Sequence, residues 1–164
     1  MTSNEKLKIN LGLPPISQIG VVVRDVDETV KYYSSVYGLG PFTLMNFEPN
    51  KHWYKRKLSH LKLRQGKTRW GNIELELMQP LEGKSLMHDF LKIHGEGLNH
   101  LGFNVRDYDE KYSKFIEAGF KPLMEAESYV EIFEGYVKAV WFDTYHIGGV
   151  YFEIIWKSWL PECQ

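Results

Sequence analysis

A short stretch of sequence occurs twice in the chain, and this repeat constrains the fold more than any other feature. Residues 18–28 read QIGVVVRDVDE and residues 100–110 read HLGFNVRDYDE, an offset of 82 positions with six of the eleven residues identical. Each copy is an apolar strand followed by acidic residues, which suit a helix N-terminus because carboxylates there accept from free backbone amides. The repeat therefore predicts two copies of one structural module.

The residues after each copy extend the module to one helix and four strands. Apolar residues recur with helical spacing in both copies, at Val26, Val30, Tyr33 and Tyr37 and at Tyr108, Tyr112, Phe115 and Ile116. A closing strand also repeats, as IELELM (73–78) and VYFEII (150–155), and aligns Glu76 with Glu153. The intervening segments have room for two further strands in each module, at 42–47 and 58–65 and at 120–125 and 135–143.

These elements predict an α+β fold made of tandem βαβββ modules. We expect a single domain over 1–164, because no flexible Pro/Ser-rich linker separates the copies. Its expected parts are module one at about 15–80, a connecting helix at about 84–95 and module two at about 97–157.

The composition limits where in the cell the protein is expected and which classes of partner it is expected to bind. The chain is 43% hydrophobic and 25% charged, as is typical of a soluble globular protein. It has no apolar run near the roughly 18 residues of a membrane span, and its N-terminus lacks the apolar segment of a secretory signal. A net charge of −1 makes no general case for nucleic acid. We therefore expect a cytoplasmic protein that binds neither nucleic acid nor membrane.

Four polar side chains stand at equivalent positions of the two modules. Duplicated modules generally pack around an approximate twofold axis, which brings together Gln18, Glu76, His100 and Glu153. A lone histidine in an apolar run is ordinarily a hydrogen-bonded structural group, but four donors at duplicated positions are a more specific signal. The single cysteine, Cys163, leaves only nitrogen and oxygen donors. The set predicts a site for one divalent ion, Zn, Ni, Co, Mn or Fe.

Two further groups of residues each have two open interpretations. The run 51–69 contains eight Lys or Arg, two His and no acid. It is either a solvated hairpin face or a grip on an anionic small molecule such as a phosphate-bearing thioester, with Arg56, Lys62 and Arg64 as contacts. The aromatic residues make up 15% of the chain. They fill the core or line a pocket, and Trp141 is the candidate for a substrate wall.

On these residues the chain resembles the vicinal oxygen chelate superfamily, which includes glyoxalase I, methylmalonyl-CoA epimerase, extradiol dioxygenases and bleomycin-resistance proteins. The resemblance covers roughly residues 15–157. It implies a cupped, mostly antiparallel sheet with a metal at its floor, and the ligands it implies are Gln18, Glu76, His100 and Glu153. Since a second subunit completes the cup in some relatives, we expect a homodimer.

Residues 76–105 are similar to the methylmalonyl-CoA epimerase group, which carries a strand, a Pro-Leu turn, a short helix and a Gly-x-x-His strand in this region. The ligand set departs from that group. Epimerases usually have histidine in place of Gln18 and glutamine in place of Glu76, whereas the set found here matches glyoxalase I of the eukaryotic type. Epimerases also place a second acid/base glutamate on the third strand of module one, where segment 58–65 offers His60, Lys62 and Arg64.

The resemblance implies an enzyme that removes a proton beside a carbonyl and stabilises the enolate on the metal. Glu153 is the first candidate for the base, Glu76 the second, and His60 the candidate for a second proton donor. The expected substrate is a small molecule, either an acyl-CoA thioester or an aromatic carbonyl compound. Two alternatives stay open: glyoxalase I-like chemistry, and a non-catalytic binder of the drug-resistance type. The two-histidine iron site of extradiol dioxygenases is disfavoured by Gln18.

Overall fold

The computed structural model describes residues 9–160, so Cys163 lies outside the described part. The strands of module one are β1 (Gln18–Val22), β2 (Thr43–Phe47), β3 (Lys51–Tyr54), β4 (Lys57–Leu58), β5 (Leu61–Trp70) and β6 (Ile73–Gly83). Those of module two are β7 (Gly97–Asn104), β8 (Pro122–Val130), β9 (Gly135–Phe142) and β10 (Tyr151–Lys157). The helices are α2 (Val26–Val36), α3 (Leu86–His94) and α4 (Tyr108–Glu117), with short 3-10 helices η1 (Glu131–Phe133) and η2 (Thr144–His146).

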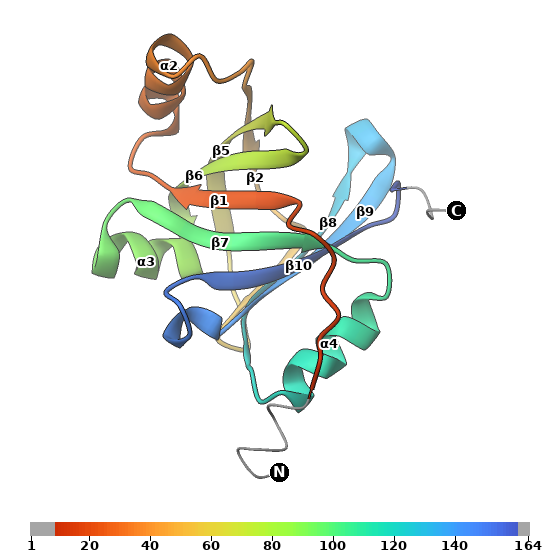
Figure 1. Ribbon diagram of the computed structural model, residues 1–164. Helices are drawn as coiled ribbons and strands as arrows, with labels where there is room; N and C mark the ends of the chain where they lie inside the picture. Colours follow the sequence, from red (N-terminus) through yellow and green to blue (C-terminus); the bar gives the residue numbers. More distant parts are fainter. Residues whose placement is uncertain (1–8, 161–164) are drawn as a thin grey trace.

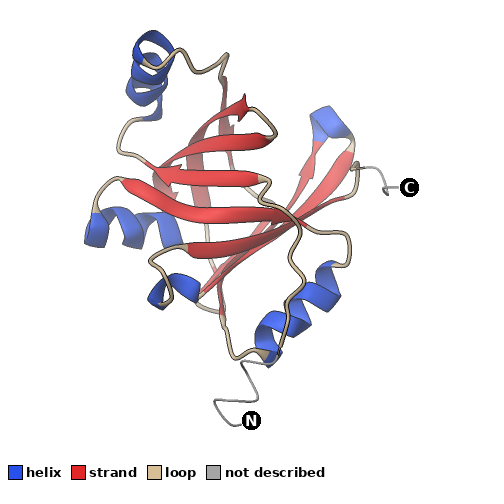
Figure 2. Ribbon diagram, in the orientation of Figure 1, coloured by secondary structure: helices blue, strands red, loops and turns tan. Residues whose placement is uncertain are grey.

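One curled sheet runs through both modules (Figures 1 and 2). Within residues 9–160 its ten strands lie in the order β2-β5-β6-β1-β7-β10-β9-β8-β3-β4. The pairs β1/β6 and β10/β7 are parallel, and the remaining pairs of this sheet are antiparallel. The order β2-β5-β6-β1 of module one is mirrored by β8-β9-β10-β7 of module two. The predicted α+β fold with two βαβββ modules is confirmed.

β6 and β8 run past the expected ends, to Gly83 and Val130, and the strand before β6 differs most. The third strand of module one was expected at 58–65, but β5 runs from Leu61 to Trp70. The residues before it form an additional hairpin of β3 and β4, and β3 pairs with β8 of module two. Much of the basic run 51–69 is therefore hairpin and turn, with Arg56 in the turn at a positive φ of 65°.

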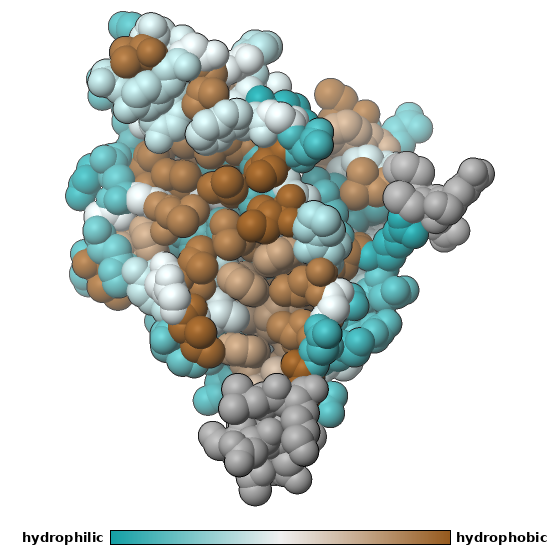
Figure 3. Space-filling view, viewed as in Figure 1, coloured by the Kyte–Doolittle hydropathy of each residue, from teal (hydrophilic) through white to brown (hydrophobic). Residues whose placement is uncertain are grey.

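The two faces of the sheet bury different apolar clusters. On the outer face, α2 packs on Val23 and Leu77, while α4 places Phe115 against Phe142. The inner face carries a larger cluster that α3 covers with its buried residues, and its buried members are Val22, Tyr54, Met78, Leu86, Met87, Phe90, Met124, Ala126, Ala139 and Trp141. Part of the outer face stays uncovered, because apolar side chains show at the surface over β1, β7 and β10 between α2 and α4 (Figure 3).

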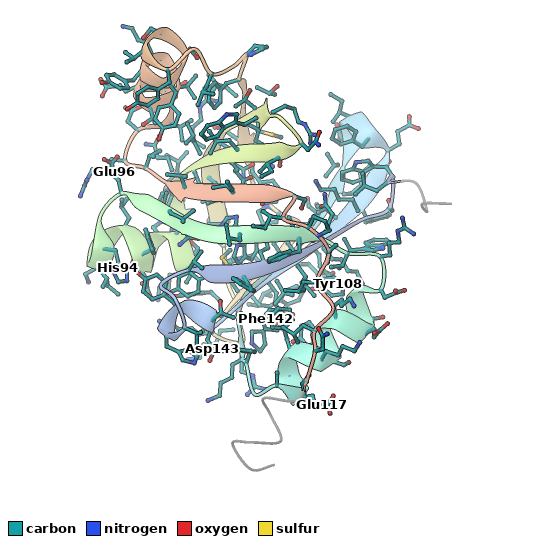
Figure 4. All side chains as sticks on the ribbon, viewed as in Figure 1. His94, Glu96, Tyr108, Glu117, Phe142 and Asp143 are labelled. Carbon is teal, nitrogen blue, oxygen red and sulfur yellow. The ribbon has the colours of Figure 1, made fainter. Side chains whose placement is uncertain are left out.

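Local hydrogen bonds set where the repeat turns from strand to helix. Asp25 caps α2 by accepting from the amide of Glu28 at 2.9 Å, as the acidic end of the repeat predicts. Glu96, just before β7, accepts from the amide of Arg24 at 2.7 Å and so links the two modules (Figure 4). No helix in the described part of the chain is long and apolar enough to cross a membrane.

We expect Asp89→Asn to weaken the anchor of α3. The Asp89 carboxylate accepts from the Tyr54 hydroxyl and lies 2.9 Å from Lys55 Nζ, and these partners hold the pKa of Asp89 below its ordinary value. A carboxyl with a lowered pKa stabilises the fold above its unfolded pKa and loses that effect as pH falls through the folded pKa. Because the pair is partly exposed, the expected loss is about 1 kcal/mol of unfolding free energy at pH 7. Urea denaturation should show the difference shrinking below about pH 4, and a difference that persists in acid would contradict this.

Candidate metal centre

The four predicted donors lie on four adjacent strands, β6, β1, β7 and β10, with their side chains on the inner face. The register places Gly20 opposite both Glu76 and His100, and Gly102 opposite both Gln18 and Glu153. The donors Gln18, Glu76, His100 and Glu153 are each no more than 5% exposed. The duplication therefore brings together, in one buried place, side chains from both modules.

His100 Nε2 is the centre of this cluster. It lies 3.0 Å from Glu153 Oε2, 3.3 Å from Gln18 Oε1 and 3.7 Å from Glu76 Oε2. An oxygen atom from each of the other three side chains is thus directed at one imidazole nitrogen. Glu153 Oε2 is buried and makes no hydrogen bond of normal geometry within the described residues.

Two neighbouring residues orient the donors. The second ring nitrogen of His100, Nδ1, lies 3.0 Å from the acceptor Asn99 Oδ1, and the Gln18 amide donates from Nε2 to Glu74 Oε1 at 2.8 Å. These contacts turn His100 Nε2 and Gln18 Oε1 towards the common space. Hydrogen bonds of this kind are typical of residues that hold metal-binding side chains in place.

The two glycines of the repeat make room for the donors. A Cβ atom on Gly20 would overlap the His100 ring, and one on Gly102 would press against the Gln18 side chain. Each glycine therefore accommodates the donor of the opposite module across the β1/β7 pair. Gly20 and Gly102 are equivalent in the repeat, which gives their identity a physical reason.

The two glutamates have different electrostatic environments. Burial alone would raise the pKa of Glu76, but the Lys67 ammonium and then His100 hold it below its ordinary value. Burial raises the pKa of Glu153 above its ordinary value, against the opposing effect of His100. Glu76 is therefore the more firmly ionised carboxylate, and Glu153 the one that more readily takes a proton.

Lys67 is a member of the cluster that the sequence interpretation missed. Its ammonium lies 2.8 Å from Glu76 Oε1 and 4.0 Å from Glu74 Oε1, and its side chain is 30% exposed, so the cluster meets solvent on this side. The two-residue turn at Gly71 and Asn72 is a hairpin signal in the sequence. Counting back from that turn places Lys67 opposite Glu76, as the register of β5 and β6 shows.

The candidates from the basic run lie away from the cluster because side chains alternate along β5. Residues 61, 63, 65 and 67 face inwards, and Lys62 and Arg64 face the other side, where they pair with Glu82 and Asp27. His60 precedes β5 and lies 3.7 Å from Glu48 and 3.6 Å from Glu82. The structure thus does not bring His60 to the donors, and a phosphate-binding role for Arg56, Lys62 and Arg64 stays a prediction.

Trp141 lies beside the cluster, and its role as a substrate wall stays a prediction. It is opposite Glu153 in the β9/β10 pair, and its ring lies nearly perpendicular to the His100 ring at a centroid distance of 5.7 Å. The indole is 7% exposed, and its Nε1 has no hydrogen-bond partner within the described residues. Trp141 therefore forms an apolar side of the cluster.

The donor chemistry fits a divalent ion. With Nδ1 donating to Asn99, a neutral His100 presents a lone pair to three acceptor oxygens, an arrangement that requires a cation, either a proton on Nε2 or a metal. Donors bound to a tetrahedral ion lie about 3.3–3.6 Å apart, close to the separations found here. Among residues 9–160, no group of three or more His, Cys, Asp and Glu side chains is arranged as it would be around a bound metal ion.

Comparison with known proteins places these features in context. The sequence profile described as the glyoxalase/bleomycin resistance protein/dioxygenase superfamily matches residues 17–136. An uncharacterized protein YqjC from Bacillus subtilis is 26% identical over 88 residues, which are 54% of this chain and 55% of YqjC. The match thus spans about half the length of that curated relative.

Three solved structures share the fold at low sequence identity. A Streptomyces coelicolor methylmalonyl-CoA epimerase in complex with 2-nitronate-propionyl-CoA is 20% identical, with a TM-score of 0.60 and coverage of 90% of this chain and 99% of that chain. The Mycobacterium tuberculosis methylmalonyl-CoA epimerase is 18% identical, with a TM-score of 0.58 and 88% of both chains covered. A mutant of 4-hydroxymandelate synthase from Streptomyces coelicolor is 15% identical, with a TM-score of 0.62, covering 92% of this chain and 51% of that chain.

We expect Gly20→Ala to destabilise the protein because the added methyl group meets the His100 ring. Overpacking of this kind costs about 1–3 kcal/mol. The same substitution in a His100→Ala background should cost markedly less, since the ring is gone, and a double-mutant cycle by urea denaturation measures the difference. Equal costs in the two backgrounds would show that the ring and the glycine are not coupled.

Proposed function

Because the chain belongs to the glyoxalase/bleomycin resistance protein/dioxygenase superfamily, we propose that it is a metal-dependent isomerase that removes a proton next to a carbonyl group. The observation that carries the proposal is the convergence of Gln18, Glu76 and Glu153 oxygens on His100 Nε2. These four side chains would hold one divalent ion. When bound, the ion would act as a Lewis acid for the carbonyl oxygen of the substrate.

Glu153 is the proposed base. The proton beside the carbonyl moves to its carboxylate, the electron pair of the broken C–H bond passes to the carbonyl oxygen, and the proton then returns to carbon in the product. Burial supports this role because it raises the pKa of Glu153, and a base is most effective when its pKa approaches the working pH. Glu76, with the Lys67 ammonium at 2.8 Å, is the second candidate.

An acyl-CoA thioester is the proposed substrate class. It is supported by the structural neighbours, since one similar epimerase was solved with 2-nitronate-propionyl-CoA. A thioester also has the acidic C–H bond beside a carbonyl that this chemistry needs. The homodimer belongs to the same proposal, supported by the apolar outer face over β1, β7 and β10 (Figure 3), and sedimentation velocity is its check.

Two other functions have specific support. Glyoxalase I-like isomerisation of a glutathione hemithioacetal is favoured by the Gln, Glu, His, Glu donor set. Non-catalytic binding of an apolar small molecule is favoured by the apolar residues that share the inner face with the donors. The three functions differ in whether they need a metal and in which substrate they turn over.

The metal requirement can be measured directly. We expect elemental analysis and calorimetry to show one divalent ion bound per chain of purified protein. His100→Ala should weaken that binding at least 100-fold, because one oriented imidazole ligand is lost. His146→Ala is the matched control, since His146 contacts the Asp143 carbonyl away from the donors. Equal metal content in the wild type and His100→Ala would contradict the site, and absence of metal from both would favour the binder.

The reaction can be identified by proton exchange with solvent deuterium. Deuterium exchange with racemisation in one acyl-CoA would identify an epimerase, and turnover of the hemithioacetal would identify glyoxalase chemistry. No exchange or turnover with any of these compounds would favour the binder. In the positive case Glu153→Gln should reduce exchange by about 10²–10⁴-fold while retaining the metal, and Glu76→Gln should weaken metal binding. The base assignment is wrong if Glu153→Gln exchanges at the wild-type rate.

A further inference from the structure

The two modules differ at the strand that lies next to each glutamate. Glu76 on β6 is opposite Lys67 on β5, whereas Glu153 on β10 is opposite Trp141 on β9. Two residues away, Gln65 on β5 corresponds in the same way to Ala139 on β9. The duplication is therefore preserved in the two glutamates and broken in the residues that stand opposite them and their neighbours.

Two side chains of β5 restrain Glu76 by donating hydrogen bonds to it. Lys67 Nζ lies 2.8 Å from Glu76 Oε1, and the Gln65 amide donates from Nε2 to the same oxygen at 3.0 Å. Gln65 is buried, and its carbonyl oxygen has no partner within the described residues. Among the described residues, the bond to Glu76 is thus the side-chain hydrogen bond that orients this amide. Both contacts are on Oε1, and Oε2 is left facing His100.

Glu153 has no such restraint from β9. Its closest polar contact in the cluster is His100 Nε2 at 3.0 Å, and its Oε2 makes no hydrogen bond of normal geometry within the described residues. The residues across from it and from its neighbour Ile155 are Trp141 and Ala139, which offer a ring and a methyl group. A carboxylate that receives no hydrogen bond from the neighbouring strand is freer to rotate than one held by two such bonds.

We propose that Lys67 and Gln65 are positioning residues that assign different roles to the two equivalent glutamates. They would fix Glu76 so that it keeps one oxygen for a bound ion, and they would leave Glu153 as the carboxylate that is free to take the proton. The ammonium also offsets one negative charge beside the ion, so it lowers the affinity for the metal. This inference rests on the proposed function and explains why one glutamate of the pair acts as the base.

Binding of Co²⁺ tests the assignment without a substrate. In Lys67→Met the ion meets one more net negative charge and a Glu76 carboxylate whose Oε1 is freed from the ammonium. We expect Co²⁺ to bind at least tenfold more tightly, and its visible absorption to weaken as the coordination number rises. Lys67→Arg should keep both wild-type properties. Gln65→Leu removes a restraint without changing charge, so it should alter the absorption in the same direction and leave the affinity within about threefold.

Lys62→Met is the matched control, because Lys62 lies on the same strand but faces away and pairs with Glu82. It should leave the Co²⁺ affinity and absorption unchanged. Wild-type affinity and absorption in both Lys67→Met and Gln65→Leu, or an equal shift in Lys62→Met, would overturn the inference while the proposed metal site stands. If neither the wild type nor Lys67→Met binds Co²⁺, the proposed function fails together with it.

Discussion

The site depends on how closely β1 and β7 approach each other across the pseudo-twofold axis. At this junction Gly20 is opposite His100, and Gly102 is opposite Gln18. A side chain at either glycine would fill the space that a donor of the other module occupies. The backbone of each module therefore shapes the place of the other's donor, so neither module contains a complete site.

Burying several charges at this junction is costly unless they compensate one another. Glu76 and Glu153 are almost fully buried, and Glu74 lies at the more exposed edge. Lys67 is the permanent cation among them, and His100 adds a second positive charge when both of its nitrogens carry protons. The negative charge that remains would be compensated by a divalent ion but not by a further apolar side chain. This electrostatic balance separates the site from an ordinary buried histidine.

Much of the fold could be predicted from the sequence because the repeat carries it. Identical residues at an offset of 82 located the opening strands, and the equivalence of Glu76 and Glu153 located the closing ones. The β5 assignment failed for a physical reason. Lys55 and Arg56 take positive φ angles in a short extra hairpin. The strand that follows therefore begins at Leu61 and not at residue 58. Because side chains alternate along β5, Lys62 and Arg64 face away from the site while Gln65 and Lys67 face it. Ion pairs of His60 with Glu48 and Glu82 could not be read from the pattern at all.

The β3–β4 hairpin has a consequence for how the chain reaches this structure. It belongs to the first half of the sequence, yet β3 hydrogen-bonds to β8 of the second half. During synthesis its edge waits unpaired until residues 122–130 have left the ribosome. Such long-range pairing slows folding, because the entropy cost of closing the loop comes before the stabilising contacts form. Strand pairing thus joins the two halves at β1/β7 and at β3/β8, so the first half has strand edges without partners until the second half is made.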